Sequence, residues 1–282
     1  MKTYIIIPAH NEANYIGRTL QSLIDQSYPA DRIVVVNDQS SDETPQIVSG
    51  FISKHPSISM ISITSSEAHL PGSKVIKAFN EGLKTLDEDF DIICKFDADL
   101  IFPLNYLETI VKHFGSSQDI GMVGGFCTIP KDDTWALENL TNKDHIRGAL
   151  KAYRKKCFKD IKGLQPSMGW DTADELTAQF QGWKIKTDPE LLVKHLKPTG
   201  TTYNKASKYK QGEAFYKLRY GLIITLIASA KLAYLKKDLR LFLDYMAGYL
   251  RAVKQKQSSL LSEEAGEFSR KLRWKKMFQK LF

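Results

Sequence analysis

Short apolar runs alternate with longer amphipathic stretches along residues 1–130. Short apolar runs are typical of buried strands, and apolar residues that recur every three or four positions are typical of helices lying on a sheet. The pattern predicts strands over residues 4–8, 33–37, 58–64, 92–96 and 122–128. It predicts helices over residues 15–27, 42–55, 74–86 and 104–114. This order of elements predicts an α/β fold with a mainly parallel sheet flanked by helices.

The last third of the chain differs in its helical apolar spacing and its basic charge. Between residues 211 and 250 the apolar residues at helical spacing are Phe215, Leu218, Leu222, Leu226, Leu239, Leu243, Met246 and Leu250. We expect them to pack in a core or between helices, the usual role of such stripes, with seating of the enzyme on the cytoplasmic leaflet of a membrane as the alternative. The C-terminal segment 268–282 combines cations with aromatic residues, and we expect it to lie on an anionic membrane surface. The chain thus divides into a sheet domain over residues 1–200 and a helical extension over residues 201–282.

Composition and charge narrow the class of protein. A content of 43% hydrophobic and 26% charged residues is ordinary for a folded soluble protein. The net charge of +8 is concentrated after about residue 195, which suits an anionic lipid surface, with a solvated helix face as the alternative. Nucleic acid is not an expected partner because no recognition motif is present.

Cysteine use and apolar runs bear on the compartment. The three cysteines, Cys94, Cys127 and Cys157, are widely spaced, so we expect reduced and mostly buried thiols in a cytoplasmic protein. The N-terminus predicts a strand rather than a signal peptide. The longest apolar stretch, residues 220–235, contains Lys231 and is shorter than the roughly 20 residues that span a bilayer. We therefore expect no transmembrane span.

Two carboxylates follow the predicted strand 92–96, in the triplet Asp97-Ala98-Asp99. Carboxylates separated by one small residue can both face one hard cation, and a cation held there can bind a diphosphate. Asp is also favoured in turns and at helix N-termini, and a helix is predicted shortly afterwards, so capping is the alternative interpretation. The triplet predicts either a metal site or a capped helix.

The loops after the first two predicted strands also carry polar groups. Residues 9–14 lack the glycine fingerprint of dinucleotide binding, which disfavours a dinucleotide-dependent dehydrogenase. In the second loop Ser41 or Asp42 can cap the next helix, whereas Asp38 stands at the strand end, where it can accept hydrogen bonds from a base or a ribose. Because ligands of such sheets bind beyond the carboxyl ends of the strands, these loops predict a nucleotide site.

Segments 5–12, 34–44 and 95–99 resemble, in order and spacing, the motifs of family 2 glycosyltransferases of the GT-A fold. Lys74 and residues 80–82 are similar to the intervening segment. The resemblance implies a GT-A (Rossmann-like) catalytic domain within residues 1–200. It implies a nucleotide-sugar donor bound by Pro8, Glu12, Asp38, Lys74 and Asp97.

The resemblance also implies a divalent metal, Mn²⁺ or Mg²⁺, on the donor diphosphate. Asp99 is its expected principal ligand, and Asp97 is expected beside it, on the metal or on ribose or sugar hydroxyls. Related enzymes sometimes supply a further ligand from a histidine in the region of His195, for which an ordinary structural role is the alternative. Residues 197–210 resemble a loop that closes over the diphosphate.

Inverting members of this family need a base that deprotonates the acceptor hydroxyl. Residues 169–183 resemble the segment that supplies it, with Asp171 at the expected position and Trp170 in place of the usual glutamate. Asp174, one helical turn along, is the rival base. The alternative is that Asp171 only caps the helix.

Together these residues imply an inverting, metal-dependent glycosyltransferase that moves one sugar from the donor to a hydroxyl of a glycan or lipid-linked acceptor in cell-surface polysaccharide assembly. Residues 197–210 contain neither a Gln-x-x-Arg-Trp nor an Arg-x-x-Arg-Trp motif, so by analogy with the family we expect a non-processive enzyme. Its expected place is the cytoplasm, at the inner face of the plasma membrane. The alternative is a non-catalytic GT-A-fold scaffold in a membrane-associated glycan assembly complex.

Overall fold

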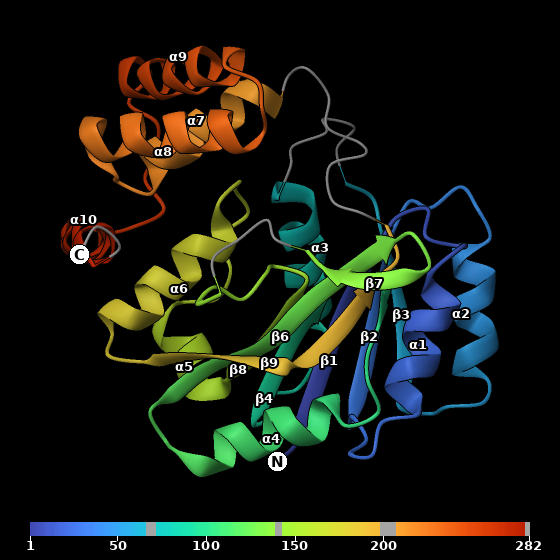
Figure 1. Cartoon of the computed structure of the whole chain (residues 1–282). Coiled ribbons are helices and arrows are strands. Elements are labelled where there is room, and N and C mark those ends of the chain that lie inside the picture. Colours follow the sequence, from blue (N-terminus) through green and yellow to red (C-terminus); the bar gives the residue numbers. More distant parts are fainter. Residues whose placement is uncertain (66–71, 139–142, 198–206, 280–282) are drawn as a thin grey trace.

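Nine strands form one sheet in the order β3-β2-β1-β4-β8-β6-β9-β5, with β7 paired to β6 (Figure 1). The computed structural model describes residues 1–65, 72–138, 143–197 and 207–279. The strands are β1 Thr3–Ala9, β2 Arg32–Asp38, β3 Ile58–Ile63, β4 Ile92–Phe96, β5 Leu100–Ile101, β6 Ile120–Lys131, β7 Thr134–Leu137, β8 Leu150–Arg154 and β9 Lys184–His195. The helices are α1 Ile16–Ile24, α2 Thr44–Ile52, α3 Ser73–Lys84, α4 Tyr106–Ser116, α5 Lys155–Asp160, α6 Trp170–Phe180, α7 Ser207–Lys217, α8 Gly221–Leu235, α9 Arg240–Lys254 and α10 Glu263–Phe278.

The predicted fold class is confirmed, and each of the nine predicted elements overlaps an observed strand or helix. Strands β3, β2, β1 and β4 are parallel, so their carboxyl ends meet at one edge. The sheet changes direction at β8, which is antiparallel to both β4 and β6. Strands β5, β7, β8 and β9 were not predicted. Strands β5 and β7 are short, β8 places charged residues inside the protein, and most residues of β9 are not buried.

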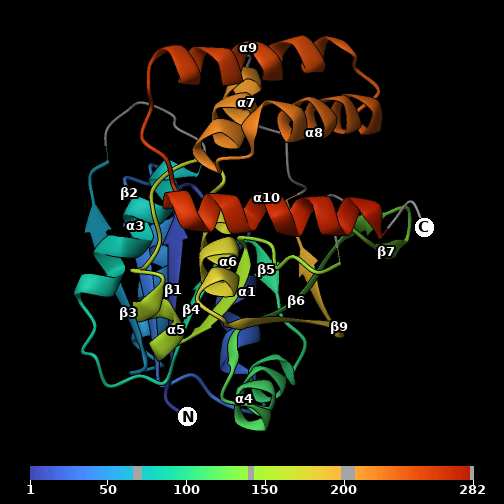
Figure 2. The ribbon, with the colours of Figure 1, turned by 90° about the vertical axis from the view of Figure 1, so that its left-hand side faces the viewer.

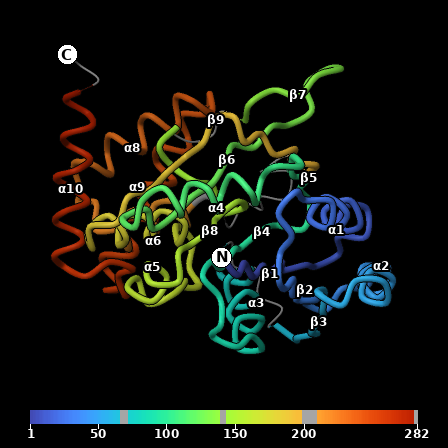
Figure 3. The backbone as a smooth tube through the Cα atoms, turned by 90° about the horizontal axis from the view of Figure 1, so that it is seen from below, coloured from blue at the N-terminus to red at the C-terminus, as the bar shows by residue number. Residues whose placement is uncertain are grey.

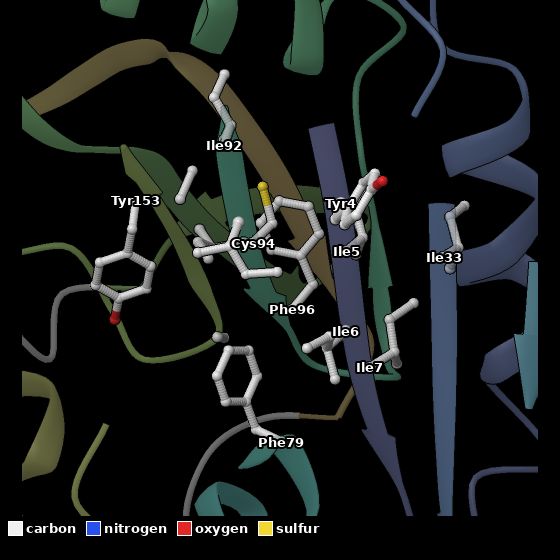
Figure 4. Packing of buried hydrophobic residues seen from close by; sticks show 14 of the residues in the cluster. Tyr4, Ile5, Ile6, Ile7, Ile33, Phe79, Ile92, Cys94, Phe96 and Tyr153 are labelled. Carbon is white, nitrogen blue, oxygen red and sulfur yellow. The ribbon is translucent and has the colours of Figure 1, made fainter. Parts of the chain in front are cut away.

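The main core lies between the sheet and its helices. Ile5, Ile6 and Ile7 of β1 are fully buried and lie near Phe79 of α3 and Phe96 of β4 (Figure 4). Figure 3 shows α3 on the opposite side of β1, β2 and β3 from α1 and α2. Helix α3 approaches the sheet closely at Gly82, where a Cβ atom would lie 2.7 Å from Val36 Cγ2 and 2.8 Å from Ile6 Cγ2.

The C-terminal helices form a second cluster of buried residues with α6. This cluster includes Ala173 and Leu176 of α6, Phe215 of α7 and Leu218, which directly follows α7. In Figures 1 and 2, α7, α8 and α9 lie beyond the end of the sheet toward which β1 runs, and α4 lies at the opposite end. None of the helices in the described ranges is long and apolar enough to cross a membrane.

The expectation that the whole apolar stripe of residues 215–250 packs in a core is wrong. Five of its members are exposed instead, namely Leu222, Leu226, Leu239, Leu243 and Leu250. Helical spacing identifies an apolar face, but it does not show whether another part of the chain covers that face. In the C-terminal segment expected on a membrane, by contrast, Leu272, Trp274 and Met277 pack against the second cluster.

Candidate active site

The Asp97-Ala98-Asp99 triplet is held by backbone contacts with three other parts of the chain. Asp97 N donates to Ala149 O (3.2 Å), and Leu196 N donates to Asp99 O (2.9 Å). Thr19 Oγ1 of α1 donates to Ala98 O (2.7 Å). The N-cap of α4 is Asn105, so neither aspartate caps that helix. Capping therefore does not account for the triplet.

His195 joins Asp99 to a second buried carboxylate. Its Nε2 lies 3.4 Å from Asp99 Oδ2, and its Nδ1 lies 3.2 Å from Glu138 Oε2. Glu138 also forms an ion pair with Arg147. Asp99, His195 and Glu138 are each less than 9% exposed. Sequence analysis missed Glu138, which follows β7 and has no motif of its own.

Asp99 and His195 could together hold a divalent cation. Their side chains face each other and offer one carboxylate oxygen and one imidazole nitrogen, both of which are metal ligands in proteins. Cys127 lies close to Glu138 and His195, and the ligand atoms of all three lie within 4.8 Å of one another. Burial raises the pKa of the Cys127 thiol to about 12, so the thiol is protonated when no cation is bound.

Asp97 has a different environment from Asp99. Its side chain is 32% exposed and forms an ion pair with Lys95, which is almost fully buried on β4. Burial alone would raise the pKa of Asp97, but the Lys95 ammonium outweighs it and holds the pKa below its ordinary value. Lys95 also donates to Gly148 O (3.0 Å). Asp97 is therefore ionised and still accessible to a ligand.

Glu12, in the loop after β1, has a carboxylate oxygen that has no hydrogen-bond partner among the described residues. Oε1 accepts from Lys197 Nζ (3.3 Å), whereas Oε2 is buried and lacks such a partner. Burial raises the pKa of Glu12 to about 7, with the charges of Asp99 and Asp97 acting in the same direction and that of Lys197 opposing them. An unpartnered buried oxygen is costly, and a ligand hydroxyl or N–H can satisfy it.

The other residues expected to bind the donor lie on β1, β2 and α3. Pro8 is half-buried in β1. Asp38 ends β2 and accepts two hydrogen bonds from Ser65, from its N (3.0 Å) and its Oγ (2.7 Å). Lys74 is half-buried in the first turn of α3. Most of the loop expected over the diphosphate, residues 198–206, lies outside the described residues.

The N-cap of α2 is Glu43, so the expectation that Ser41 or Asp42 caps this helix is wrong. Asp42 instead ties the first and second loops together. Its Oδ1 accepts from Thr44 N at the start of α2 (3.0 Å), and its Oδ2 accepts from Ala13 N (3.0 Å). Thr44 Oγ1 in turn accepts from Glu12 N (2.8 Å). The position of Glu12 is thus fixed by the beginning of α2.

The two candidate bases on α6 differ in burial and in pairing. Asp171, in the first turn, has a side chain that is 33% exposed and lies 3.6 Å from His145 Nε2. Asp174 is buried, and its oxygens accept from Lys151 Nζ (2.8 Å) and Tyr153 Oη (2.5 Å). Asp174 is therefore held inside the protein, and Asp171 faces the solvent.

His145, which sequence analysis missed, sets the charge of Asp171. Burial opposes protonation of His145, but its contacts with Asp171 and Glu175 raise its pKa to about 9. Burial likewise opposes ionisation of Asp171, but His145 and Lys151 lower its pKa to about 2. The pair is thus an imidazolium and a carboxylate at neutral pH, and Asp171 can accept a hydrogen bond from an acceptor hydroxyl.

Trp170 stands over two buried ammonium groups. Lys95 of β4 and Lys151 of β8 are directly opposite in the sheet, so their side chains leave it on the same face. The Trp170 ring centroid lies 5.5 Å from Lys95 Nζ and 5.7 Å from Lys151 Nζ. An aromatic face attracts cations, which accounts for an indole where the resemblance implied a glutamate.

The strand order, the carboxylates beyond the parallel strands and the helices on both faces define a GT-A-like fold. The profile of glycosyl transferase family 2 matches residues 4–168, more than half of the chain. The chain belongs to this family, as its motifs implied.

Two curated relatives and one solved structure illustrate the likeness. A probable glycosyltransferase of Bacillus subtilis, YdaM, is 40% identical over 100 residues, which are 35% of this chain and 23% of that protein. Poly-beta-1,6-N-acetyl-D-glucosamine synthase of Staphylococcus epidermidis is 26% identical over 237 residues, 73% of this chain and 53% of the synthase. The chain thus matches about half or less of these relatives. The fold is similar to that of the mannosyltransferase PcManGT from Pyrobaculum calidifontis in complex with GDP-Man and Mn²⁺, with a TM-score of 0.59, 19% identity and coverage of 100% of this chain and 81% of that one.

Replacing Glu12 by glutamine should stabilise the protein at alkaline pH. The pKa of Glu12 is raised from 4.5 to about 7 on folding, so the folded state loses stability as pH rises through this window. At pH 8 the cost is about 3 kcal/mol at most, and Glu12→Gln removes it. Denaturant unfolding at pH 8 should show this gain, and most of it should be absent at pH 5. The control is Glu43→Gln, at an exposed residue; an equal gain at both pH values would contradict the assignment.

Proposed function

We propose that this chain transfers a sugar from a nucleotide-sugar donor to an acceptor hydroxyl with inversion at the anomeric carbon. One arrangement carries the proposal. Beyond the carboxyl ends of β1 and β4, Asp99 faces His195, and Glu12 lies close enough for the charge of Asp99 to raise its pKa. Glu12 Oε2 is buried and has no hydrogen-bond partner in the described part of the chain. A metal ion and a polar ligand are the groups that such an arrangement accommodates. PcManGT, which has a similar fold, was solved in complex with GDP-Man and Mn²⁺, which supports a nucleotide sugar and a divalent cation as the ligands.

Asp99 and His195 would hold Mn²⁺ or Mg²⁺, with Asp97 beside them. When bound, the cation neutralises charge on the departing nucleoside diphosphate. Glu12 Oε2 and the accessible carboxylate of Asp97 accept hydrogen bonds from donor hydroxyl or N–H groups, which satisfies the orphaned oxygen. Pro8, Asp38 and Lys74 complete the donor site, with Asp38 held in place by Ser65.

Asp171 is the proposed base. The bond between the acceptor oxygen and the anomeric carbon forms as the bond between that carbon and the diphosphate oxygen breaks, and the acceptor proton passes to an Asp171 oxygen. The partly exposed side chain of Asp171 and its low pKa, about 2, keep an ionised oxygen available at neutral pH. Asp174 holds Lys151 and Tyr153 and serves to position α6.

The proposed acceptor is a glycan or lipid-linked hydroxyl in cell-surface polysaccharide assembly, at the inner face of the plasma membrane. The likeness to a synthase of poly-beta-1,6-N-acetyl-D-glucosamine supports this class of product. Trp135 of β7 is 39% exposed and offers a flat apolar face on which a sugar ring can stack.

Nucleotide sugars should stabilise the protein against heat only together with Mn²⁺. At 100 times its Kd, a donor contributes about 2.7 kcal/mol to the free energy of unfolding. A thermal-shift screen of UDP-, GDP-, TDP- and CMP-sugars should therefore single out one nucleotide family. Asp99→Asn should abolish the metal-dependent part, and Asp89→Asn, at an exposed carboxylate, should not. Stabilisation by no donor would overturn the proposal, whereas binding without transfer to any acceptor would favour the scaffold.

Asparagine should lower the transfer rate at one of the two candidate base positions and the stability at the other. Asp171→Asn should lower transfer about 10²- to 10⁴-fold and leave donor binding unchanged, because only proton acceptance is lost. Asp174→Asn should instead cost about 3–5 kcal/mol of stability, because Lys151 loses a buried partner. Initial rates, corrected for the folded fraction, separate the two effects. Full activity of Asp171→Asn would contradict the proposal that Asp171 is the base and would leave it only a role at the beginning of the helix.

Glu138→Gln should weaken Mn²⁺ binding about 10- to 100-fold, because Glu138 fixes the orientation of the His195 ring. The measurement is calorimetric titration of Mn²⁺ into the folded protein without donor. Cys127→Ala, a change in the same cluster, is the matched control and should leave the affinity within about twofold, since the proposed ligands are Asp99 and His195. Equal loss in both variants would indicate a general disturbance of the cluster.

A further inference from the structure

A large part of the exposed apolar surface lies on α8, on α9 and on the turn between them. More than half of the large hydrophobic side chains that are exposed in the described part of the chain lie between residues 222 and 253. They are Leu222, Ile223, Leu226, Ile227, Tyr234, Leu235, Leu239, Leu243, Leu250 and Val253. Isolated exposed apolar residues are normal, but a concentration of this kind marks an interaction surface.

The tip of this helical hairpin joins its most exposed apolar residues to cations. Tyr234, Leu235 and Leu239 are 78%, 62% and 79% exposed. Lys236, Lys237 and Arg240 stand between and after them and are exposed too. Across residues 221–256 the chain carries seven Lys and Arg residues against two Asp. Apolar side chains bordered by an excess of positive charge suit a membrane surface, where anionic headgroups cover an apolar acyl layer.

The packing of α9 on α7 directs this face outward. Gly212 of α7 and Gly248 of α9 meet so closely that a Cβ on Gly212 would lie 1.8 Å from Tyr245 O, and one on Gly248 would lie 2.0 Å from Tyr209 O. Side chains larger than a hydrogen atom have no room at this crossing. The buried side of α9 is therefore fixed, and Leu239, Leu243 and Leu250 remain on the other side.

We propose that the α8–α9 hairpin inserts its exposed apolar side chains into an anionic lipid bilayer. Helix α8 is 15 residues long, too short to span the roughly 30 Å apolar layer, so the hairpin lies in the interface. Figures 1 and 2 place it at the end of the molecule toward which β1 runs, the end that carries Glu12. The proposal differs from the sequence-based expectation, which gave this role to the C-terminal segment 268–282. It does not depend on the proposed transferase activity.

Vesicle flotation without donor or metal tests the proposal. The whole chain should float with vesicles of mixed phosphatidylcholine and phosphatidylglycerol, and at least about tenfold less with phosphatidylcholine alone, because several cations lie near the surface. The triple variant Leu235→Ser, Leu239→Ser, Leu243→Ser should bind the mixed vesicles at least about tenfold more weakly, because it removes apolar side chains that leave water on insertion. Its melting temperature should match that of the wild type, since the three residues are exposed.

Three further variants serve as controls. Leu104→Ser, at a 63% exposed residue just before α4 at the opposite end, should bind like the wild type. Phe278→Ser, at an exposed residue of the last helix, should also bind like the wild type, which separates α10 from the hairpin. Lys236→Gln, Lys237→Gln, Arg240→Gln combined should lose the preference for phosphatidylglycerol.

Two results would overturn the proposal. One is a triple serine variant that floats as well as the wild type. The other is absence of vesicle binding combined with a concentration-dependent dimer, seen by light scattering, that the triple serine variant loses. That second result would assign the same face to a second copy of the chain.

Discussion

Two ammonium groups buried side by side, those of Lys95 and Lys151, are the constraint on which the candidate site depends. Like charges directly opposite in a sheet repel, and neither ammonium reaches solvent. Each therefore needs carboxylates within hydrogen-bond distance, which Asp97 supplies to Lys95 and α6 supplies to Lys151. The Asp97-Ala98-Asp99 triplet and helix α6 are thus oriented by two neighbouring strands, β4 and β8, at the point where the sheet changes direction. Removing either lysine would disturb both halves of the site.

Much of the fold was predictable because its first half is built from regular patterns. Parallel strands buried on both faces give continuous apolar runs, and their covering helices give a regular apolar spacing. Strand β8 has neither signal, because Lys151 is inside the protein and is neutralised by residues that are distant in sequence. The apolar stripe of the C-terminal helices was visible in the sequence, but whether it is covered depends on tertiary packing that local spacing does not encode.

The candidate site was predictable where it follows strand ends. Asp97, Asp99 and Glu12 come directly after parallel strands, so the topology alone brings them to one edge. Glu138 follows β7 and His145 precedes β8 along the chain, and no local sequence pattern marks either residue. Asp171 and Asp174 are one helical turn apart, and only burial and pairing distinguish them.

Trp170 has a consequence for how the site titrates. Where the resemblance implied a glutamate next to the aspartate, two neighbouring carboxylates would share protons, and their apparent pKa values would belong to the pair. Here the indole has no group that titrates in this range, and Asp171 is the acidic residue of the first turn of α6. The charge of that turn therefore depends on Asp171 and on the imidazolium of His145, which also contacts the buried carboxylate of Glu175 in the next turn.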